Sequence, residues 1–152
     1  MKYEIYVKGC GDSSNNAATC ALVLKCNGEY LHKTAIRFEE YIGKGTDYPI
    51  IDNKAQFQME LYAIAWAMAL VADKSASFMV YTNNLAVAGW IKKWDVPDDY
   101  RNLFRACRLL LNGREIDAEH IRKDSDIEEN RQVNEAANYL LKMSGNQVRY
   151  VF

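Results

Sequence analysis

The chain has 152 residues, of which 49% are hydrophobic and 26% charged, and its formal net charge is −1. This composition is typical of a globular protein and excludes a disordered or membrane class, and the length favours one domain over 1–152. Proteins that grip nucleic acid mainly through phosphates usually carry a basic excess, so any such binding must depend on local charge here. No apolar run reaches the length of a signal peptide core or a membrane span, which predicts a cytoplasmic protein without membrane contact.

The first third of the chain predicts an antiparallel meander of three strands, 3–8, 17–26 and 30–38. The first strand alternates polar and apolar residues and stops at Gly9, which makes Lys8 its last residue. The Asn27-Gly28 dipeptide is typical of a tight hairpin turn, so the second and third strands pair directly.

Two segments are candidates for contact with a protein partner. The loop 39–53 is longer than a compact connection needs. Its aromatic and aliphatic side chains either pack as a flap, which is the favoured interpretation, or form a sticky surface. The C-terminal tail 144–152 alternates Val148, Tyr150 and Phe152, a pattern that either pairs along a sheet edge or docks in a groove of a partner. A protein partner or a homodimer through 39–53 and 146–152 is therefore one hypothesis.

The rest of the chain alternates helices with strands. Apolar residues at helical spacing predict a helix over 55–72, and a compact apolar run predicts a strand over 77–82. Further on, the pattern predicts helices over 84–94 and 100–111, a strand over 115–121 and a last helix over 127–142. The order β-β-β-α-β-α-α-β-α implies a mixed sheet, whose ligands gather beyond the carboxyl ends of its parallel strands.

Glu60 is the anomaly of the first long helix, because it lies three residues after Phe57 and four before Ile64, on their inward side. A carboxylate there either sits at the edge of the apolar stripe and reaches water, or is buried and must be paired, coordinated or protonated. The first alternative is the commoner one for a lone glutamate, but polar residues at neighbouring strand ends favour the second.

Amide side chains occupy two further places. Asn83 follows the strand 77–82, a position that a helix N-cap explains equally well. Asn130, Asn134 and Asn138 stand four apart on one face of the last helix. They form either a solvated stripe, the favoured interpretation, or the lining of a cleft.

The four cysteines and two histidines have no spacing typical of a zinc site. In the expected compartment disulfide frameworks are rare, so buried free thiols are favoured. The cysteines are Cys10, Cys20, Cys26 and Cys107.

Taken together, the element order and these polar positions resemble the type 1 ribonuclease H family, from Tyr3 to about Lys142. That family carries aspartate in a D-G-S turn, glutamate in a pattern like M-E-L-x-A, and aspartates in T-D-S and N-x-x-x-D-x-x-A. This sequence reads VKGC, MELYA, YTNN and NRQVNEAA at those places. The matching residues are Lys8, Glu60, Asn83 and Asn134.

The resemblance implies an α/β fold of the ribonuclease H type, a five-stranded mixed sheet with three antiparallel strands and then parallel strands, flanked by helices. In such enzymes the carboxylates hold two Mg²⁺ ions roughly 4 Å apart. Here only the glutamate remains and the four groups sum to zero charge, so we expect no bound metal and no cofactor. As a hypothesis, the ammonium of Lys8 replaces the metal electrostatically and pairs with Glu60.

The resemblance also bears on the grip of a substrate. Family members commonly have T-N-N before the helix glutamate to hold the minor groove of an RNA–DNA hybrid, whereas this chain has Ala55, Gln56 and Phe57. Asp124 stands about where the family carries a loop histidine that aids release. The candidate nucleic-acid contacts around the cleft are Ser14, Asn15, Asn16, Gln56 and Gln58.

The leading hypothesis is a non-catalytic ribonuclease H-like protein, a pseudo-nuclease, that binds nucleic acid such as RNA or RNA–DNA hybrid. The alternative is a protein-interaction or self-association scaffold without a nucleic-acid role. A residual metal-dependent ribonuclease H would need recruited carboxylates, for which Asp12, Asp124 and Asp126 are the nearby candidates.

Overall fold

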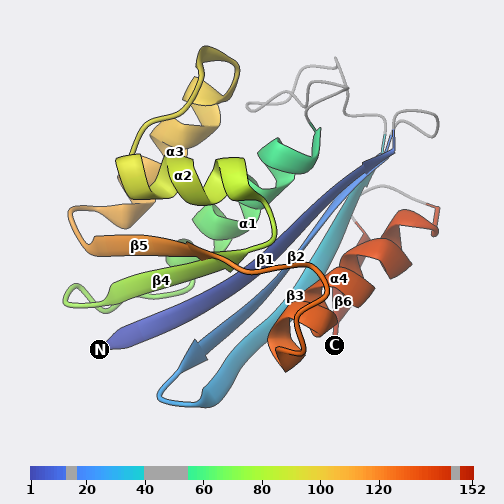
Figure 1. Ribbon diagram of the computed structural model, residues 1–152, viewed down its shortest axis with the longest axis horizontal. Helices are drawn as coiled ribbons and strands as arrows, with labels where there is room; N and C mark the ends of the chain where they lie inside the picture. Colours follow the sequence, from blue (N-terminus) through green and yellow to red (C-terminus); the bar gives the residue numbers. More distant parts are fainter. Residues whose placement is uncertain (13–16, 40–54, 145–147) are drawn as a thin grey trace.

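The computed structural model describes residues 1–12, 17–39, 55–144 and 148–152, which form one sheet with helices on both faces (Figure 1). The strands are β1 (Lys2–Asp12), β2 (Ala17–Cys26), β3 (Glu29–Glu39), β4 (Ser77–Thr82), β5 (Glu115–His120) and β6 (Val148–Val151). The helices are α1 (Ala55–Ala69), α2 (Leu85–Lys93), α3 (Arg101–Leu111) and α4 (Glu128–Leu141), with a short 3₁₀ turn at Asp98–Tyr100 before α3.

The sheet is mixed, in the order β5-β4-β1-β2-β3-β6. β1, β2 and β3 form the predicted antiparallel meander, and β4 and β5 run parallel to β1. The expected five strands are corrected to six, because the C-terminal tail adds β6 antiparallel to β3, with Thr34 opposite Val151 and Arg37 opposite Val148. The tail thus pairs along the sheet edge of its own chain, one of the two alternatives that its alternating pattern left open.

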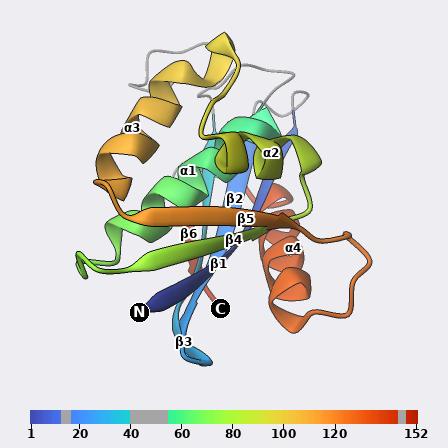
Figure 2. The same ribbon diagram turned by 60° about the vertical axis from the view of Figure 1, so that its left-hand side comes forward.

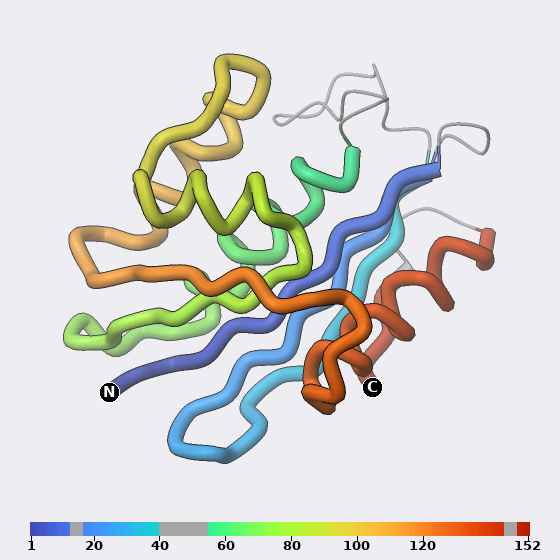
Figure 3. The backbone as a smooth tube through the Cα atoms, viewed as in Figure 1, coloured from blue at the N-terminus to red at the C-terminus, as the bar shows by residue number. Residues whose placement is uncertain are grey.

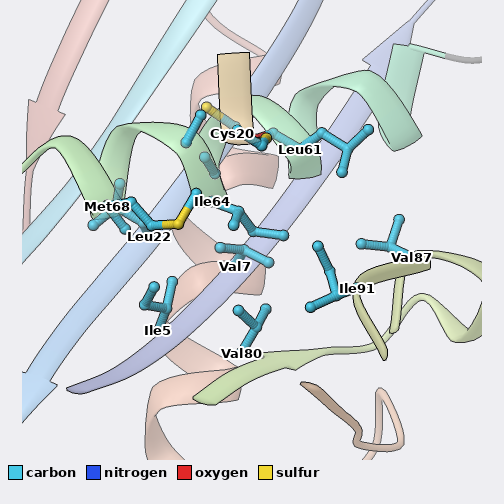
Figure 4. Close-up of a cluster of buried hydrophobic side chains, with 14 of the residues drawn as sticks. Ile5, Val7, Cys20, Leu22, Leu61, Ile64, Met68, Val80, Val87 and Ile91 are labelled. Carbon is cyan, nitrogen blue, oxygen red and sulfur yellow. The ribbon is translucent and has the colours of Figure 1, made fainter. Parts of the chain in front are cut away.

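The helices divide between the two faces of the sheet. α1, α2 and α3 cover one face and α4 covers the other (Figure 2). β1 serves both layers, because Ile5 and Val7 point into the larger core while Tyr6, between them, packs under α4. Figure 4 shows Val7 next to Ile64 of α1, with Ile5 and Leu61 in the same cluster of the larger core.

β1 continues four residues beyond its predicted end, so Lys8 is not the last residue of the strand. The glycines after it reflect the close approach of α1, not a turn. A Cβ on Gly9 would lie 2.3 Å from the backbone oxygen of Gln56, and one on Gly11 would lie 2.7 Å from the Cβ of Ala55. The start of α1 therefore rests directly on this part of the strand.

Two cations, a partly buried lysine and a buried arginine, fasten α4 to the sheet. Lys25 of β2 donates to Glu129 Oε1 over 2.7 Å, and the side chains of the pair are only 16% and 11% exposed. Arg37 of β3 is 3% exposed and its Nη1 donates to the backbone oxygens of Leu140 and Leu141, at 3.2 and 2.7 Å. These contacts hold both ends of α4 against the sheet, because Glu129 lies in its first turn and the two carbonyls in its last.

The cysteines are free and buried, as expected from their spacing. No helix of the described segments is both long and apolar enough to cross a membrane.

Candidate functional site

A cleft of about 400 Å³ opens where β4 ends beside β1. β4 stops at Thr82, opposite Val7, so Lys8 is the first residue of β1 beyond the end of its parallel neighbour. The residues that line the cleft are Lys8, Gln56, Phe57, Glu60, Asn83, Asn84, Leu85, Ala86 and Lys123. Three of the four positions matched from sequence therefore line one cleft, at the edge of the sheet where such folds gather ligands.

Glu60 is 2% exposed, so the interpretation that it reaches water is wrong. Its position over Gly9, where α1 lies against β1, excludes solvent. The hydroxyl of Thr82 donates to Glu60 Oε1, and the backbone N–H of Gly9 donates to the same carboxyl group. Burial raises the pKa of Glu60 to about 7, although these two hydrogen bonds and the nearby positive charge of Lys8 oppose the rise. Burial therefore favours the protonated form of this group more than water favours it for an exposed glutamate.

Lys8 is half buried and faces the cleft. Its charge lowers the pKa of Glu60 through space, yet Lys8 Nζ has no carboxylate within 4.0 Å among residues whose placement is described. The expected direct ion pair with Glu60 is thus not formed. Thr82 takes that place, since its hydroxyl donates to Glu60 and accepts the backbone N–H of Asn84 over 2.9 Å.

An amide network joins the other two matched positions. Asn134 Nδ2 donates to Asn83 Oδ1 over 2.9 Å, and Asn83 Nδ2 donates to Asn130 Oδ1 over 2.7 Å. Asn130 is 2% exposed, so the solvated interpretation of the asparagine stripe is wrong at that position, whereas Asn138 is exposed. Asn84, not Asn83, is the N-cap of α2 and accepts from the backbone N–H of Val87.

Lys123 lines the cleft and was missed by sequence reasoning, whereas Asn130, expected only as part of the asparagine stripe, holds the segment that carries Lys123. Asn130 Nδ2 donates to the backbone oxygen of Lys123 over 3.3 Å and to Ser125 Oγ over 3.2 Å. This fixes the connection that leads from β5 to α4 past the end of β4 (Figure 3). The spacing of Asn130 one turn before Asn134 was a usable signal, but nothing in the sequence shows that Lys123 reaches the cleft.

These residues do not fit a pair of Mg²⁺ ions. Hard divalent cations require several oxygen ligands with negative charge. The oxygens of Asn83 and Asn130 instead accept hydrogen bonds from neighbouring amides, and Lys8 adds a positive charge. In the described parts of the chain no three His, Cys, Asp or Glu side chains gather as metal ligands do.

The carboxylates considered as recruits do not line the cleft as it is described. Asp124 lies 3.5 Å from Arg122 Nε and is 80% exposed. Asp12 is at the end of β1, four residues beyond Lys8, and Asp126 is exposed before α4.

The predicted nucleic-acid contacts of α1 differ in position. Gln56 is exposed and lines the cleft, whereas Gln58 is 5% exposed and its side chain would have to turn outward to meet a ligand. Phe57 packs against Trp90 and Tyr100, with ring centroids 5.7 and 6.0 Å away. Ser14, Asn15, Asn16 and the loop 40–53 lie outside the described residues.

Comparison with known proteins identifies the fold. No family model and no curated protein sequence matches the chain. RNase H1 of the halophilic archaeon Halobacterium salinarum superposes with a TM-score of 0.67 at 19% identity, over 93% of this chain and 98% of that one. The N-terminal RNase H domain of a Mycobacterium tuberculosis protein gives 0.64 at 16% identity, over 93% and 96%. LC11-RNase H1 in complex with an RNA/DNA hybrid gives 0.60 at 17% identity, over 92% and 99%.

The chain therefore has the fold of type 1 ribonucleases H, as the resemblance implied, over more than nine tenths of its length.

Proposed function

We propose that the protein is a non-catalytic ribonuclease H-like module that binds nucleic acid, with RNA or an RNA–DNA hybrid as the ligand. The fold supports the nucleic-acid part, since LC11-RNase H1, which shares it, is solved with an RNA/DNA hybrid. The chemistry of the cleft supports the non-catalytic part, because a scaffold can keep its shape while its site changes role.

The observation that carries this proposal is the replacement of charge within one cleft. Lys8, Asn83 and Asn134 stand where the resemblance puts aspartates. Lys8 and Asn83 line the cleft together with Glu60, and Asn134 donates a hydrogen bond to Asn83. Glu60 itself is buried and its pKa is raised to about 7. A site with this balance repels divalent cations and attracts anions.

Contact with the ligand is assigned to the mouth of the cleft. Gln56 is exposed there and offers both a donor and an acceptor to sugar or base edges. Ser14, Asn15 and Asn16 remain proposed contacts in the connection between β1 and β2. The net charge of −1 means that phosphate attraction comes from a few local lysines, so we expect weak affinity.

Fluorescence anisotropy with labelled RNA–DNA hybrid, double-stranded RNA and double-stranded DNA tests the proposal. With two phosphates neutralised, affinity should fall roughly tenfold between about 50 and 200 mM salt. The hybrid should remain intact during long incubation with Mg²⁺ or Mn²⁺. Cleavage would overturn the non-catalytic assignment, and the absence of salt-sensitive binding to every probe would overturn the nucleic-acid role.

A second candidate function is self-association or protein binding. β6 is one of the two edge strands of the described sheet, and its Val151 is 73% exposed. Beside it, Tyr150 packs against Tyr139 and Phe152 at centroid distances of 5.3 and 5.9 Å, so the edge carries an aromatic cluster. A short exposed edge strand of this kind accepts a further strand. Light scattering that gives a dimer mass, unchanged by hybrid, would favour this function over the first.

A further inference from the structure

We propose that the cleft holds a phosphate group directly, between the ammonium groups of Lys8 and Lys123. The inference rests on the proposed function and reverses the chemistry expected from the fold, because a site for two metal cations becomes a site for one anion.

Two lysines, Lys8 and Lys123, give the lining of the cleft a positive charge. Lys8 comes from β1 and Lys123 from the connection before α4, so two separate elements each direct a cation to the same 400 Å³ space. Glu60 is the sole carboxylate among the described lining residues, and Thr82 and Gly9 occupy it with hydrogen bonds. An anion that enters the cleft therefore meets two positive charges and a carboxyl group already satisfied by the protein.

Lys8 is the first of these two cations. Lys8 is partly exposed and its ammonium has three donors, and among the described residues no hydrogen bond or ion pair to it is formed. A cation with free donors that faces a cleft favours a ligand that supplies oxygen atoms. A phosphate group brings several charged acceptor oxygens and matches a lysine as a point charge.

Backbone N–H groups at the start of α2 add neutral donors to the two lysines. Leu85 and Ala86 line the cleft as the first residues of α2. The side chain of Asn84 accepts the N–H of Val87, which leaves the two preceding N–H groups of the first turn without an intrahelical acceptor. These groups and the dipole of α2 add donors aimed at an anion that the lysines attract.

Phosphate of this kind comes either from a nucleic-acid backbone or from a free phosphate or nucleotide. Two arms of one experiment separate these sources. In the first arm, amide chemical shifts are followed by NMR during titration with inorganic phosphate and, separately, with chloride at matched ionic strength. In the second arm, the salt dependence of hybrid binding is measured.

The variants are Lys8→Gln and Lys123→Gln, with Lys8→Arg as the charge-preserving form and Lys74→Gln as the control. Lys74 is exposed on the turn before β4, at the opposite end of that strand from the cleft. Lys123 is exposed, so its replacement leaves the fold intact whatever happens at Lys8.

In the first arm, phosphate should shift the amides of Leu85 and Ala86 in the natural protein and in Lys74→Gln, and the shifts should vanish in Lys8→Gln. In the second arm, Lys8→Gln and Lys123→Gln should each reduce the slope of log affinity against log salt by about 1. Lys8→Arg, which keeps the charge, should retain the slope, and Lys74→Gln should leave it unchanged.

If the natural protein binds phosphate through Lys8 but no hybrid, the phosphate site stands, its ligand is a free phosphate and the proposed function fails. Hybrid binding with the same slope in every variant would overturn the phosphate site and leave the proposed function standing. Phosphate shifts no larger than those caused by chloride, together with no hybrid binding, would overturn both.

Discussion

At the residue scale, Glu60 shows how a carboxyl group is accommodated in a protein core. The neighbouring groups do not neutralise it with a direct ion pair. They supply a hydroxyl donor from Thr82 and a backbone donor from Gly9, and the remaining cost appears as a raised pKa. Replacing Glu60 by glutamine, its isosteric amide, should therefore remove a cost in folding free energy that grows as the pH rises.

The free energy of unfolding of Glu60→Gln, relative to that of the natural protein, should be greater at pH 8 than at pH 5. The pKa of Glu60 rises from 4.5 to about 7, so the folded chain binds the proton more tightly than the unfolded chain. Stability from this group is complete below pH 4.5 and is lost as pH rises to about 7. The loss amounts to roughly 3 kcal/mol at about 1.36 kcal/mol per pKa unit.

Urea unfolding at the two pH values measures this difference. Glu115→Gln, which replaces an exposed carboxylate at the start of β5, should change stability by less than about 0.5 kcal/mol at either pH. An equal effect of Glu60→Gln at pH 5 and pH 8 would show that the carboxyl group is not forced toward its protonated form.

Two glycines with opposite surroundings give a second residue-scale prediction. Gly9→Ala should destabilise the protein by roughly 1–3 kcal/mol or more, because the new Cβ would lie 2.3 Å from the Gln56 oxygen and 2.8 Å from the Glu60 nitrogen. Gly89→Ala, within α2, meets nothing within 4 Å and should stabilise by about 0.5–1 kcal/mol. Thermal unfolding of both variants should show shifts of opposite sign, and a harmless Gly9→Ala would contradict the contact between α1 and β1.

At the element scale, Arg37 holds the end of α4 to β3. Its guanidinium donates to the carbonyls of Leu140 and Leu141, and Nη2 lies 3.5 Å from Glu39 Oε2. Exchange of this buried arginine for an apolar side chain removes the Arg37 donor from the Leu141 carbonyl, whereas the Leu140 carbonyl still accepts the backbone N–H of Met143.

We therefore expect Arg37→Met to lower the free energy of unfolding by about 3 kcal/mol, with the loss concentrated at the end of α4. Arg101→Met is the matched control, since Arg101 is 64% exposed and pairs with Asp98 at the surface. Its effect should stay under about 1 kcal/mol. Hydrogen exchange should show faster exchange for the last turn of α4 in Arg37→Met alone, and uniform exchange changes would contradict a local anchor.

The elements that hydrophobic periodicity marks clearly were predictable. Strands 17–26 and 77–82 have the bounds that alternation and apolar runs gave them, and the helices differ by up to three residues at their ends. The pattern predicts that β1 ends before Gly9, but this glycine reflects the helix packed above it and not a turn. The pattern does not predict β6, since a four-residue strand depends on a partner far away in sequence.

The site was predictable where it rests on spacing and not where it rests on contacts. The motif positions located Lys8, Glu60 and Asn83 at one cleft, since each follows from its place on an element. The missing ion pair, the burial of Asn130 and the approach of Lys123 depend on distances between elements, which a sequence pattern does not contain.

At the scale of the whole molecule, the geometry of the fold and the charge of its site are separable. The topology that brings β1, α1, β4 and α4 together is intact, whereas the formal charge at the four matched positions is zero. Asn83 and Asn134 bind each other through an amide hydrogen bond, whereas two carboxylates at the same positions would repel.

The last prediction follows from that separation. The triple variant Lys8→Asp, Asn83→Asp, Asn134→Asp places four carboxyl groups around the cleft, with Glu60 as the fourth. Without divalent ions it should unfold at a lower temperature than the natural protein, because anions at close range repel and the amide hydrogen bonds are lost. Millimolar Mg²⁺ should raise its Tm, by a stabilisation of about 2.7 kcal/mol when the ion is present at roughly 100 times its Kd.

The natural protein provides the comparison, because its cleft holds Lys8 and neutral amides and should show no Mg²⁺ effect beyond that of a monovalent salt at equal ionic strength. Replacing Asn138, which is exposed on the same face of α4, with aspartate adds a charge away from the cleft lining and should leave the response unchanged. A gain of Mg²⁺-dependent stability confined to the triple variant would mean that the positions of the four carboxyl groups, more than the sequence around them, decide whether this fold binds metal. An equal response in the natural protein would mean that it already binds the ion, and the assignment of the cleft to anions would fail.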